Sequence, residues 1–275
     1  MHSPHADISA GETIANTSAI SRAEAAQHHL RFATTHLGQR LSPGAKILDF
    51  GCGIGGSVGV LLAQGYDAYG VDIREYWGRD LESYWDIKHR PHPDVAARLK
   101  LLDLQAYRLP FEDDTFDFCF SDQVFEHIFD YRAAMSEIVR VLKPGAISCH
   151  RFPGPNYPME GHINVPLPWL CYSRSYLALW ALLAQARGRE ANWRDRVDRH
   201  ADAMRHNNYP TKAKLHRIAR SAGAEISFFE AEEFAFRGGG RFGPFLERLR
   251  GIGLDRLVVR AAGLMMQRYM VLRAG

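Results

Sequence analysis

Cysteine is scarce in this 275-residue chain, and its four cysteines, Cys52, Cys119, Cys149 and Cys171, form no C-x-x-C pair. That scarcity excludes a disulfide framework and a zinc ribbon, and it favours a reducing, cytoplasmic setting. Long hydrophobic runs are also lacking. The most lipid-like stretch, Ser175–Ala186, is too short to cross a bilayer, which needs about 20 residues. We therefore expect no transmembrane segment.

Internal repeats, low-complexity tracts and a secretory signal are absent as well, and residues 1–18 are small and polar, so we expect a flexible tail there. The whole chain has an ordinary globular composition, with 46% hydrophobic and 24% charged residues. Its net charge of +3 hides an asymmetry, because residues 1–150 are acidic overall and residues 151–275 are basic. The basic half could favour an anionic or lipid-linked partner, or it could be a solvated arginine-rich surface.

Hydrophobic periodicity divides the chain into alternating strands and helices. Short apolar strands are expected at Lys46–Phe50, Ala68–Val71, Leu99–Leu102, Phe116–Phe120, Ala146–Cys149, Glu225–Phe229 and Arg268–Leu272. Helices are expected at Ser21–Arg40, Ser57–Gln64, Arg74–Asp86, Tyr131–Leu142, Thr211–Ala222 and within Pro244–Met266. Repeated units of this kind predict a doubly wound, Rossmann-like α/β fold around a parallel sheet.

Residues 153–210 break this rhythm, since they are rich in proline and tryptophan and contain a helical stretch around Tyr176–Ala186. We expect them to form a cap inserted after the fifth strand. The predicted organisation is a tail at 1–18, a cofactor-binding core at 19–152, a substrate cap at 153–210 and a C-terminal completion of the core at 211–275.

The first strand runs into a glycine-rich turn, Ile47-Leu48-Asp49-Phe50-Gly51-Cys52-Gly53-Ile54-Gly55-Gly56. Glycines at such a place let the backbone turn tightly and approach a ligand. Gly51, Gly53 and Gly56 match the dinucleotide pattern G-x-G-x-x-G, whereas Asp49 with the next three alternate glycines matches D-x-G-x-G-x-G. The carboxylate of Asp49 would repel a pyrophosphate and attract a cationic ligand, which favours the second pattern.

In these residues the chain resembles the class I methyltransferases that use S-adenosylmethionine, specifically a type 11-like family. The resemblance covers about residues 30–146. It also rests on Leu109-Pro110-Phe111-Glu112-Asp113-Asp114-Thr115-Phe116-Asp117, on Glu126-His127 and on Leu142-Lys143-Pro144-Gly145. It implies a seven-stranded sheet whose last strand is antiparallel, with the cap inserted after strand five.

The cofactor would lie at the carboxyl ends of the strands. Asp72 ends the second strand, where its carboxylate could accept two hydrogen bonds from a ribose diol, and Asp103 follows the third, where it could accept from the adenine amine. By the resemblance, Asp49 and the loop glycines hold the methionine end. The predicted cofactor-binding residues are Asp49, Gly51, Gly53, Gly55, Asp72, Asp103, Leu104 and Ser121.

Methyl transfer to a hydroxyl requires a positioned acceptor and a group that takes its proton. Three histidines compete for that role on position alone. His150 is favoured because it directly follows the fifth strand and precedes a proline-rich loop, with His162 second and His127 third. His150, Glu160 and His162 could also hold a divalent metal, but they form no tight motif, so no metal is predicted.

Aromatic and acidic side chains in the insertion are candidates for acceptor binding. We predict substrate contacts for Tyr157, Glu160 and Trp169, since aromatic faces suit a sugar or a flat acceptor, although aromatic residues in a cap also form its core. Basic residues near the C-terminus alternate with leucine and valine and could rest on a membrane surface. They are Arg248, Arg250, Arg256 and Arg260.

The predicted function is S-adenosylmethionine-dependent O-methylation of a small-molecule or glycan hydroxyl, in the cytoplasm or at the periphery of a membrane. A non-catalytic S-adenosylmethionine-binding module is the main alternative, followed by an NAD-type oxidoreductase, which Asp49 disfavours. No nucleic-acid partner is expected, because no interleaved basic and aromatic motif is present. Acceptor identity and oligomeric state do not follow from the sequence.

Overall fold

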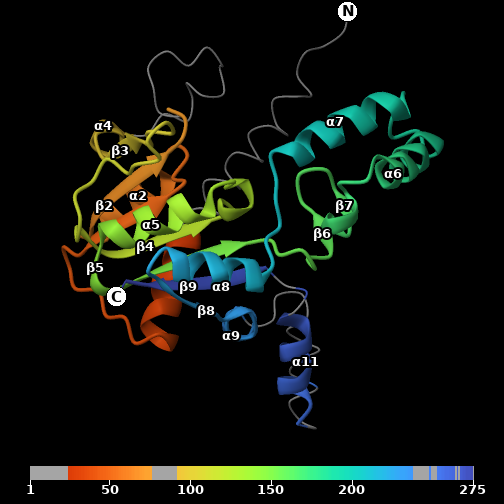
Figure 1. The fold of residues 1–275 in the computed structure, drawn as a ribbon. Helices are drawn as coiled ribbons and strands as arrows, with labels where there is room; N and C mark the ends of the chain where they lie inside the picture. The colour runs from red at the N-terminus through yellow and green to blue at the C-terminus, as the bar shows by residue number, and fades with distance from the viewer. Residues whose placement is uncertain are drawn as a thin grey trace, which may run out of the picture. The chain divides into compact units, whose positions relative to one another are not determined.

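The structure is a computed structural model that describes residues 24–75, 92–237, 248, 253–263, 265 and 267–274 (Figure 1). Several expectations lie outside these residues. They are the tail at 1–18, the start of the helix expected at Ser21–Arg40, all but the first residues of the helix expected at Arg74–Asp86, Arg250, and much of the stretch Pro244–Met266. The described part of the first helix spans residues 24–36.

A seven-stranded sheet, ordered β3-β2-β1-β4-β5-β9-β8, forms the framework (Figure 1). Its strands are β1 Lys46–Phe50, β2 Asp67–Asp72, β3 Leu99–Leu101, β4 Phe116–Asp122, β5 Leu142–Phe152, β8 Glu225–Phe228 and β9 Arg268–Arg273. Strand β1 pairs in parallel with β2 and β4, and β2 pairs in parallel with β3. The doubly wound Rossmann-like α/β prediction is therefore confirmed.

The last strand runs against its neighbour β5. The backbone N–H of Ala274, just after β9, donates to the carbonyl of Ala146 in the first half of β5 at 3.1 Å. The side chain of Arg268, at the other end of β9, lies beside Gly154, which follows the end of β5. Because β9 begins where β5 ends, the two strands are antiparallel, as predicted.

The helices that accompany the strands are α2 Gly56–Ala63, α4 Pro93–Ala96, α5 Tyr131–Val141, α8 Lys212–Ser221, α9 Glu230–Phe236 and α11 Asp255–Gly263. Of these, α2, α5, α8 and α11 match helices expected from the periodicity, whereas α4 and α9 were not predicted. At the start of α8, the Thr211 hydroxyl accepts a hydrogen bond from the Lys214 N–H at 3.2 Å. This N-cap satisfies one of the donors that a helix leaves unpaired at its first turn.

The start of β5 differs from the prediction. The helix expected at Tyr131–Leu142 ends at Val141, within one residue of the expectation, but the strand expected from Ala146 already begins at Leu142. The N–H groups of Asp114 and Thr115 donate to the carbonyls of Arg140 and Val141 at 3.0 and 2.9 Å. These bonds take up carbonyls of the last helical turn, so the helix ends before the proline is reached.

The chain forms two compact units. The first unit comprises Met1–Asp122, Ser136–Cys149 and Leu272–Gly275, and the second comprises Gln123–Met135 and His150–Val271. In the first unit the side chains of Ile47, Leu48 and Phe118 are fully buried. The second unit joins residues 211–271 to the insertion, so the functional division at 152 and 210 stays a prediction.

Within the second unit, the insertion has a hydrophobic cluster of its own. A two-stranded antiparallel sheet, β6 Met159–Glu160 with β7 Val165–Pro166, precedes the short helix η2 Pro168–Leu170 and the helices α6 Arg174–Ala186 and α7 Trp193–Arg205. The cluster comprises Ile163, Val165, Cys171, Leu177, Ala181, Val197 and Met204, with Trp180 partly buried against it. None of the helices that the structure describes is long and apolar enough to cross a membrane.

Candidate cofactor and acceptor sites

The glycine-rich turn of the first unit adopts the conformations that its residues predict. Gly51, Gly53 and Gly55 all have positive φ angles, of 85°, 54° and 80°, which residues other than glycine rarely adopt. A Cβ on Gly55 would also lie 2.8 Å from Cδ1 of Leu99. Both the backbone conformation and the close approach of Leu99 therefore require glycine at position 55.

The carboxylate of Asp72 ties the end of β2 to this turn. Its Oδ2 accepts a hydrogen bond from the N–H of Gly53 at 2.8 Å, and its Oδ1 accepts one from the N–H of Ile73 at 2.7 Å. Each carboxylate oxygen keeps a further lone pair for a ribose hydroxyl, a contact that both cofactor classes use at this position.

The other predicted cofactor residues lie at the ends of the strands of the first unit. Asp49 and Ser121 are buried within β1 and β4. Asp103 caps a turn, since its Oδ1 accepts hydrogen bonds from the N–H groups of Gln105 and Ala106 at 2.9 and 3.2 Å. The side chain of Leu104, beside that cap, is exposed. Cofactor contacts of all these residues stay a prediction.

His150, the base favoured from the sequence, is fully buried in the second unit. Its ring centroid lies 4.4 Å from that of Phe125. Burial lowers the pKa of His150 to about 3, because the charged imidazolium loses its hydration. An imidazole with so low a pKa accepts a proton poorly near neutral pH. A catalytic role for His150 stays a prediction, but its surroundings rank it below the other two histidines.

Glu160 and His162 form a carboxylate–imidazole pair in the same unit. Glu160 is fully buried, and its Oε1 accepts a hydrogen bond from Nδ1 of His162 at 2.7 Å. The same carboxylate accepts from the Tyr209 hydroxyl at 2.6 Å, from the Ile163 N–H at 2.8 Å and from the Asn207 amide at 3.2 Å. Glu160, predicted from the sequence to contact substrate, thus has four donors from the protein itself.

The pKa values of the two groups move apart. Burial alone would raise the pKa of Glu160, but hydrogen bonds from His162, Tyr209 and Ile163 outweigh it and lower the pKa. The hydrogen bond to Glu160 raises the pKa of His162 above 6.5. Because Nδ1 carries the proton that Glu160 accepts, Nε2 of His162 is the nitrogen left to exchange a proton.

His127 adjoins this pair. Its ring centroid lies 5.1 Å from that of His162, with the two rings nearly perpendicular. Nδ1 of His127 lies 3.1 Å from the carbonyl of His206, to which it donates. Burial lowers the pKa of His127, and the charge of His162 lowers it further. Two of the three predicted histidines therefore lie together, with pKa values displaced in opposite directions.

The segment 206–209 holds this arrangement, and sequence reasoning missed it. Besides the contacts of His206, Asn207 and Tyr209 described above, the N–H of Asn208 donates to the carbonyl of Glu126 at 2.6 Å. The hydroxyl of Tyr131 donates to Asn208 Oδ1. The available signal was the unbroken run of four polar side chains between two helices and ahead of Pro210.

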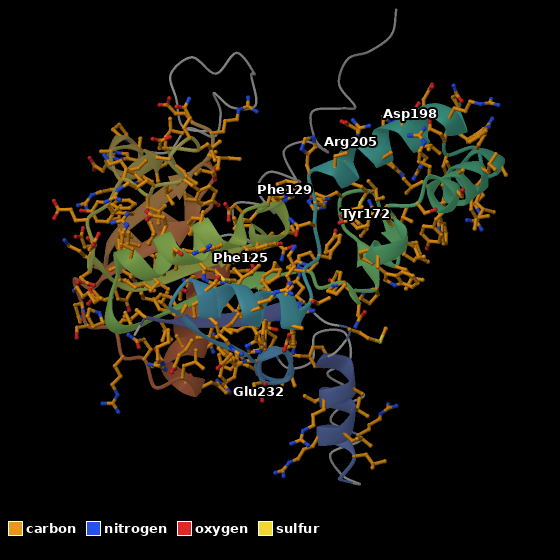
Figure 2. The ribbon with its side chains drawn as sticks, viewed as in Figure 1. Phe125, Phe129, Tyr172, Asp198, Arg205 and Glu232 are labelled. Atoms are coloured by element: carbon orange, nitrogen blue, oxygen red, sulfur yellow. The ribbon has the colours of Figure 1, made fainter. Side chains whose placement is uncertain are left out.

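The two aromatic residues predicted to bind substrate are accessible to different extents. Tyr157 is half-buried, and its N–H donates to the Gly154 carbonyl at 3.0 Å. Trp169, in η2, is exposed. Tyr172, labelled in Figure 2, is exposed as well, and its hydroxyl donates to the carbonyl of Asn207. Trp169 offers an aromatic face to solvent, and its contact with an acceptor stays a prediction.

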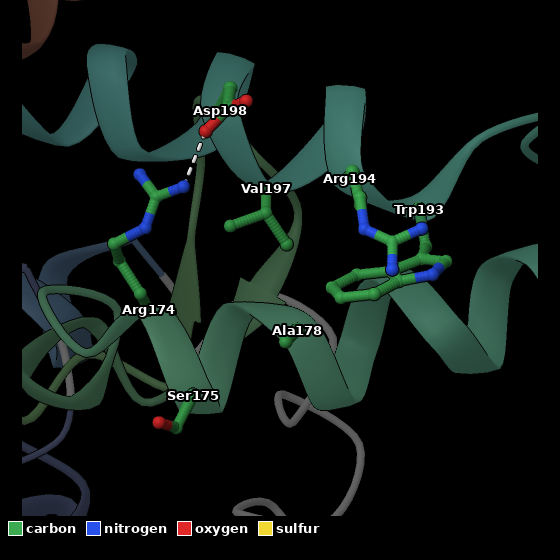
Figure 3. Close-up of a pocket in the computed structure, with 7 residues that line it drawn as sticks. All are labelled: Arg174, Ser175, Ala178, Trp193, Arg194, Val197 and Asp198. Carbon is green, nitrogen blue, oxygen red and sulfur yellow. Dashed lines mark hydrogen bonds and ion pairs between the residues drawn. The ribbon is translucent and has the colours of Figure 1, made fainter.

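A separate hollow of about 380 Å³ lies between α6 and α7 (Figure 3). Arg174, Ser175, Trp193, Arg194 and Asp198 line it, and none of the residues predicted from the sequence to bind cofactor or substrate does. Arg174 is ion-paired with Asp198 across the two helices.

Comparison with known proteins places residues 48–149 in a family of methyltransferase domains. An O-methyltransferase from Aspergillus nomiae is 32% identical over 117 residues, which is 41% of this chain and 49% of that protein. A sterol 24-C-methyltransferase from Gibberella zeae is 32% identical over 108 residues, 39% of this chain and 27% of that protein. The structure of an S-adenosylmethionine dependent methyltransferase from Mesorhizobium loti is 17% identical with a TM-score of 0.49, covering 85% of this chain and 93% of that one.

The chain therefore carries a class I, S-adenosylmethionine-dependent methyltransferase domain, which confirms the resemblance drawn from its loops. It spans about half or less of the length of the curated relatives it matches. The matched region ends at residue 149, ahead of the Glu160–His162 pair. The relatives named above methylate different elements, oxygen in one and carbon in the other, so the acceptor must be argued from this chain's own residues.

Proposed function

We propose that the protein transfers a methyl group from S-adenosylmethionine to a hydroxyl of a small molecule or glycan, and that His162 accepts the hydroxyl proton. In this step the acceptor oxygen attacks the methyl carbon and the carbon–sulfur bond breaks. S-adenosylhomocysteine leaves, and the proton passes to Nε2 of His162. The observation that carries the proposal is the buried carboxylate of Glu160 on Nδ1 of an exposed imidazole.

Three features of this pair suit a base. Glu160 selects the tautomer of His162, holds the ring in one orientation and stabilises the imidazolium that forms on proton transfer. The hydrogen bond to Glu160 raises the pKa of His162 above its usual value, which makes the imidazole a stronger base. His127, whose pKa is lowered, stays neutral beside it and is the second candidate.

The methyl donor is assigned to the first unit. Asp49 and the turn at Gly51, Gly53 and Gly55 would hold the methionine end, and Asp72 the ribose. The carboxylate of Asp49, two residues before the first glycine of the turn, supports this cationic donor over a dinucleotide, and hence a methyltransferase over an oxidoreductase. A non-catalytic S-adenosylmethionine-binding module would need no pair such as Glu160 and His162.

We propose further that the acceptor is an anionic or lipid-linked hydroxyl compound, methylated in the cytoplasm or at a membrane surface. The exposed side chains of Arg256, Leu257 and Arg260 on α11 support it, since they combine charge with apolar surface. A matched relative named for a sterol substrate makes a lipid acceptor chemically reasonable.

The test uses isotopically labelled S-adenosylmethionine with a panel of sugars, phenols and sterols, each paired with an amine of similar shape. The proposal expects label on oxygen for at least one hydroxyl compound and a rate that rises with pH through the pKa of His162. Label on nitrogen alone would contradict O-methylation. Binding of S-adenosylmethionine without transfer to any member of the panel would favour the non-catalytic module.

A further inference from the structure

Helix α6 is apolar on two faces. Leu177, Ala181 and Ala184 are buried in the cluster of the insertion. On the solvent side, Leu179, Leu182 and Leu183 are 53%, 47% and 37% exposed. Surface helices normally present polar side chains to water, and this one has a single charged residue, Arg174 at its first position. The three exposed leucines define what we call the outer face of α6.

Basic residues follow helix α6 along the chain. Residues 174–205, which contain α6 and α7, have more arginines than acidic residues and no lysine. Arg187 and Arg189, directly after α6, are exposed. Nearby carboxylates are taken up by other arginines, since Glu190 pairs with Arg199 at 2.5 Å and Asp198 with Arg174. The segment that contains the outer face therefore carries a net positive charge.

The hollow between α6 and α7 adds groups that suit a phosphate. Arg174 and Ser175 line it from α6, and Arg194 lines it from α7 with its guanidinium 4.7 Å from the ring centroid of Trp193 (Figure 3). Arginine and hydroxyl donors bind phosphate oxygens, and tryptophan favours the boundary between lipid and water. Asp198 also lines the hollow, where its ion pair with Arg174 neutralises one of the two cations.

We propose that the outer face of α6 docks on an anionic lipid surface. Leu179, Leu182 and Leu183 would enter the boundary between headgroups and acyl chains, and Arg187, Arg189 and Arg194 would meet lipid phosphates. A helix of this length spans roughly 20 Å, less than the ~30 Å hydrocarbon layer, so it would lie along the surface. The inference concerns lipid binding and stands whether or not the acceptor is a hydroxyl compound.

The experiment measures binding of the full chain to two kinds of vesicle, one of phosphatidylcholine alone and one in which half of the lipid is phosphatidylglycerol. No acceptor is added, so no methyl transfer takes place. The test variant is Leu179→Gln, Leu182→Gln and Leu183→Gln together, which keeps a helix-forming side chain at each exposed position. A second variant, Arg187→Gln with Arg189→Gln, removes charge. The matched control is Leu167→Gln, an exposed leucine of the insertion outside α6, and Leu257→Gln tests the rival surface on α11. Circular dichroism and S-adenosylmethionine affinity report folding of every variant.

We expect wild type and Leu167→Gln to bind anionic vesicles, with binding that weakens in neutral vesicles and at high salt. The triple glutamine variant should bind at least about tenfold more weakly, and the double arginine variant should lose its preference for anionic lipid. Absence of wild-type binding, or equal binding by the triple variant, would overturn the inference. Loss in Leu257→Gln alone would assign the contact to α11. A wild-type dimer that the triple variant converts to a monomer, with no vesicle binding, would assign the face to a second copy of the chain.

Discussion

Glu160, with no exposed side-chain surface, accepts a hydrogen bond at 2.7 Å from His162, whose side chain is 42% exposed. A buried carboxylate therefore orients an imidazole that solvent and ligands can reach. Glu160 acts through His162 and is a positioning residue, and this relationship makes the following predictions specific.

Replacing Glu160 with glutamine should lower kcat by about tenfold to a hundredfold, with KM for S-adenosylmethionine unchanged. The amide cannot stabilise an imidazolium as the carboxylate does, so the pKa of His162 should fall. The acidic limb of the kcat–pH profile should move to lower pH, and NMR titration of His162 should show the same shift.

The matched control is Glu190→Gln, which removes a carboxylate from a surface ion pair with Arg199 in the same unit. It should leave both kcat and the acidic limb unchanged. A Glu160→Gln enzyme that loses turnover with no movement of the limb would reduce Glu160 to a structural role.

The Glu160–His162 pair should also make stability depend on pH. His162 has a raised folded pKa, so its contribution is complete below its unfolded value of 6.5 and disappears as pH rises through the folded value. Glu160 has a lowered folded pKa, so its contribution exists above its unfolded value of 4.5 and disappears as pH falls through the folded value. The pair should stabilise the protein most between about pH 4.5 and 6.5.

Urea unfolding of wild type and His162→Gln checks this window. The difference in unfolding free energy should be larger at pH 6 than at pH 9, by less than about 1 kcal/mol, because solvent screens the exposed imidazole. An equal difference at both pH values would show that His162 is not charged in the folded pair.

His150→Ala should destabilise the protein by about 2 to 4 kcal/mol, since it removes a fully buried ring packed on Phe125. The acidic limb of the pH profile should persist in the variant, because His150 has a pKa of about 3 and does not titrate in that range. Loss of the limb in a folded His150→Ala protein would restore His150 as the base. Thermal unfolding and the kcat–pH profile are the two measurements.

Asp72→Ala should weaken S-adenosylmethionine binding by about tenfold to a hundredfold, through loss of the ribose contact and of the support for the turn at Gly53. Asp113→Ala is the control, since it removes an exposed carboxylate paired with Arg140 in the same unit. Calorimetry should find its affinity unchanged. Equal affinities for wild type and Asp72→Ala would remove Asp72 from the site.

The sheet and its glycine-rich turn were predictable because their signals are local. Apolar runs such as Lys46–Phe50 can form a buried strand directly, and a strand followed by spaced glycines specifies a tight turn. Helix α7 was missed because it buries only Val197 and Met204 on its core side, which leaves a weak apolar period. Strand β5 begins at Leu142 and not at Ala146, because N–H groups from a distant turn pair with the last carbonyls of α5, which no local pattern reveals.

The site was predictable only in part, for a similar reason. His127 follows β4, His150 lies within β5 and His162 lies in the insertion, so position in the chain proposed all three. Their ranking depends on burial and on partners such as Tyr209, which lies 49 residues from Glu160 along the chain. Long-range hydrogen bonds of this kind leave no periodic signal, and they decide which imidazole keeps a useful pKa.

The most direct test of the account is the kcat–pH profile of wild type and His162→Gln, assayed at saturating labelled S-adenosylmethionine with a hydroxyl acceptor found by the panel. The account predicts label on the acceptor oxygen, a wild-type acidic limb above pH 6.5, and a His162→Gln enzyme about a hundredfold slower that lacks this limb while it binds S-adenosylmethionine normally. A His162→Gln enzyme that keeps both its turnover and its acidic limb would contradict it.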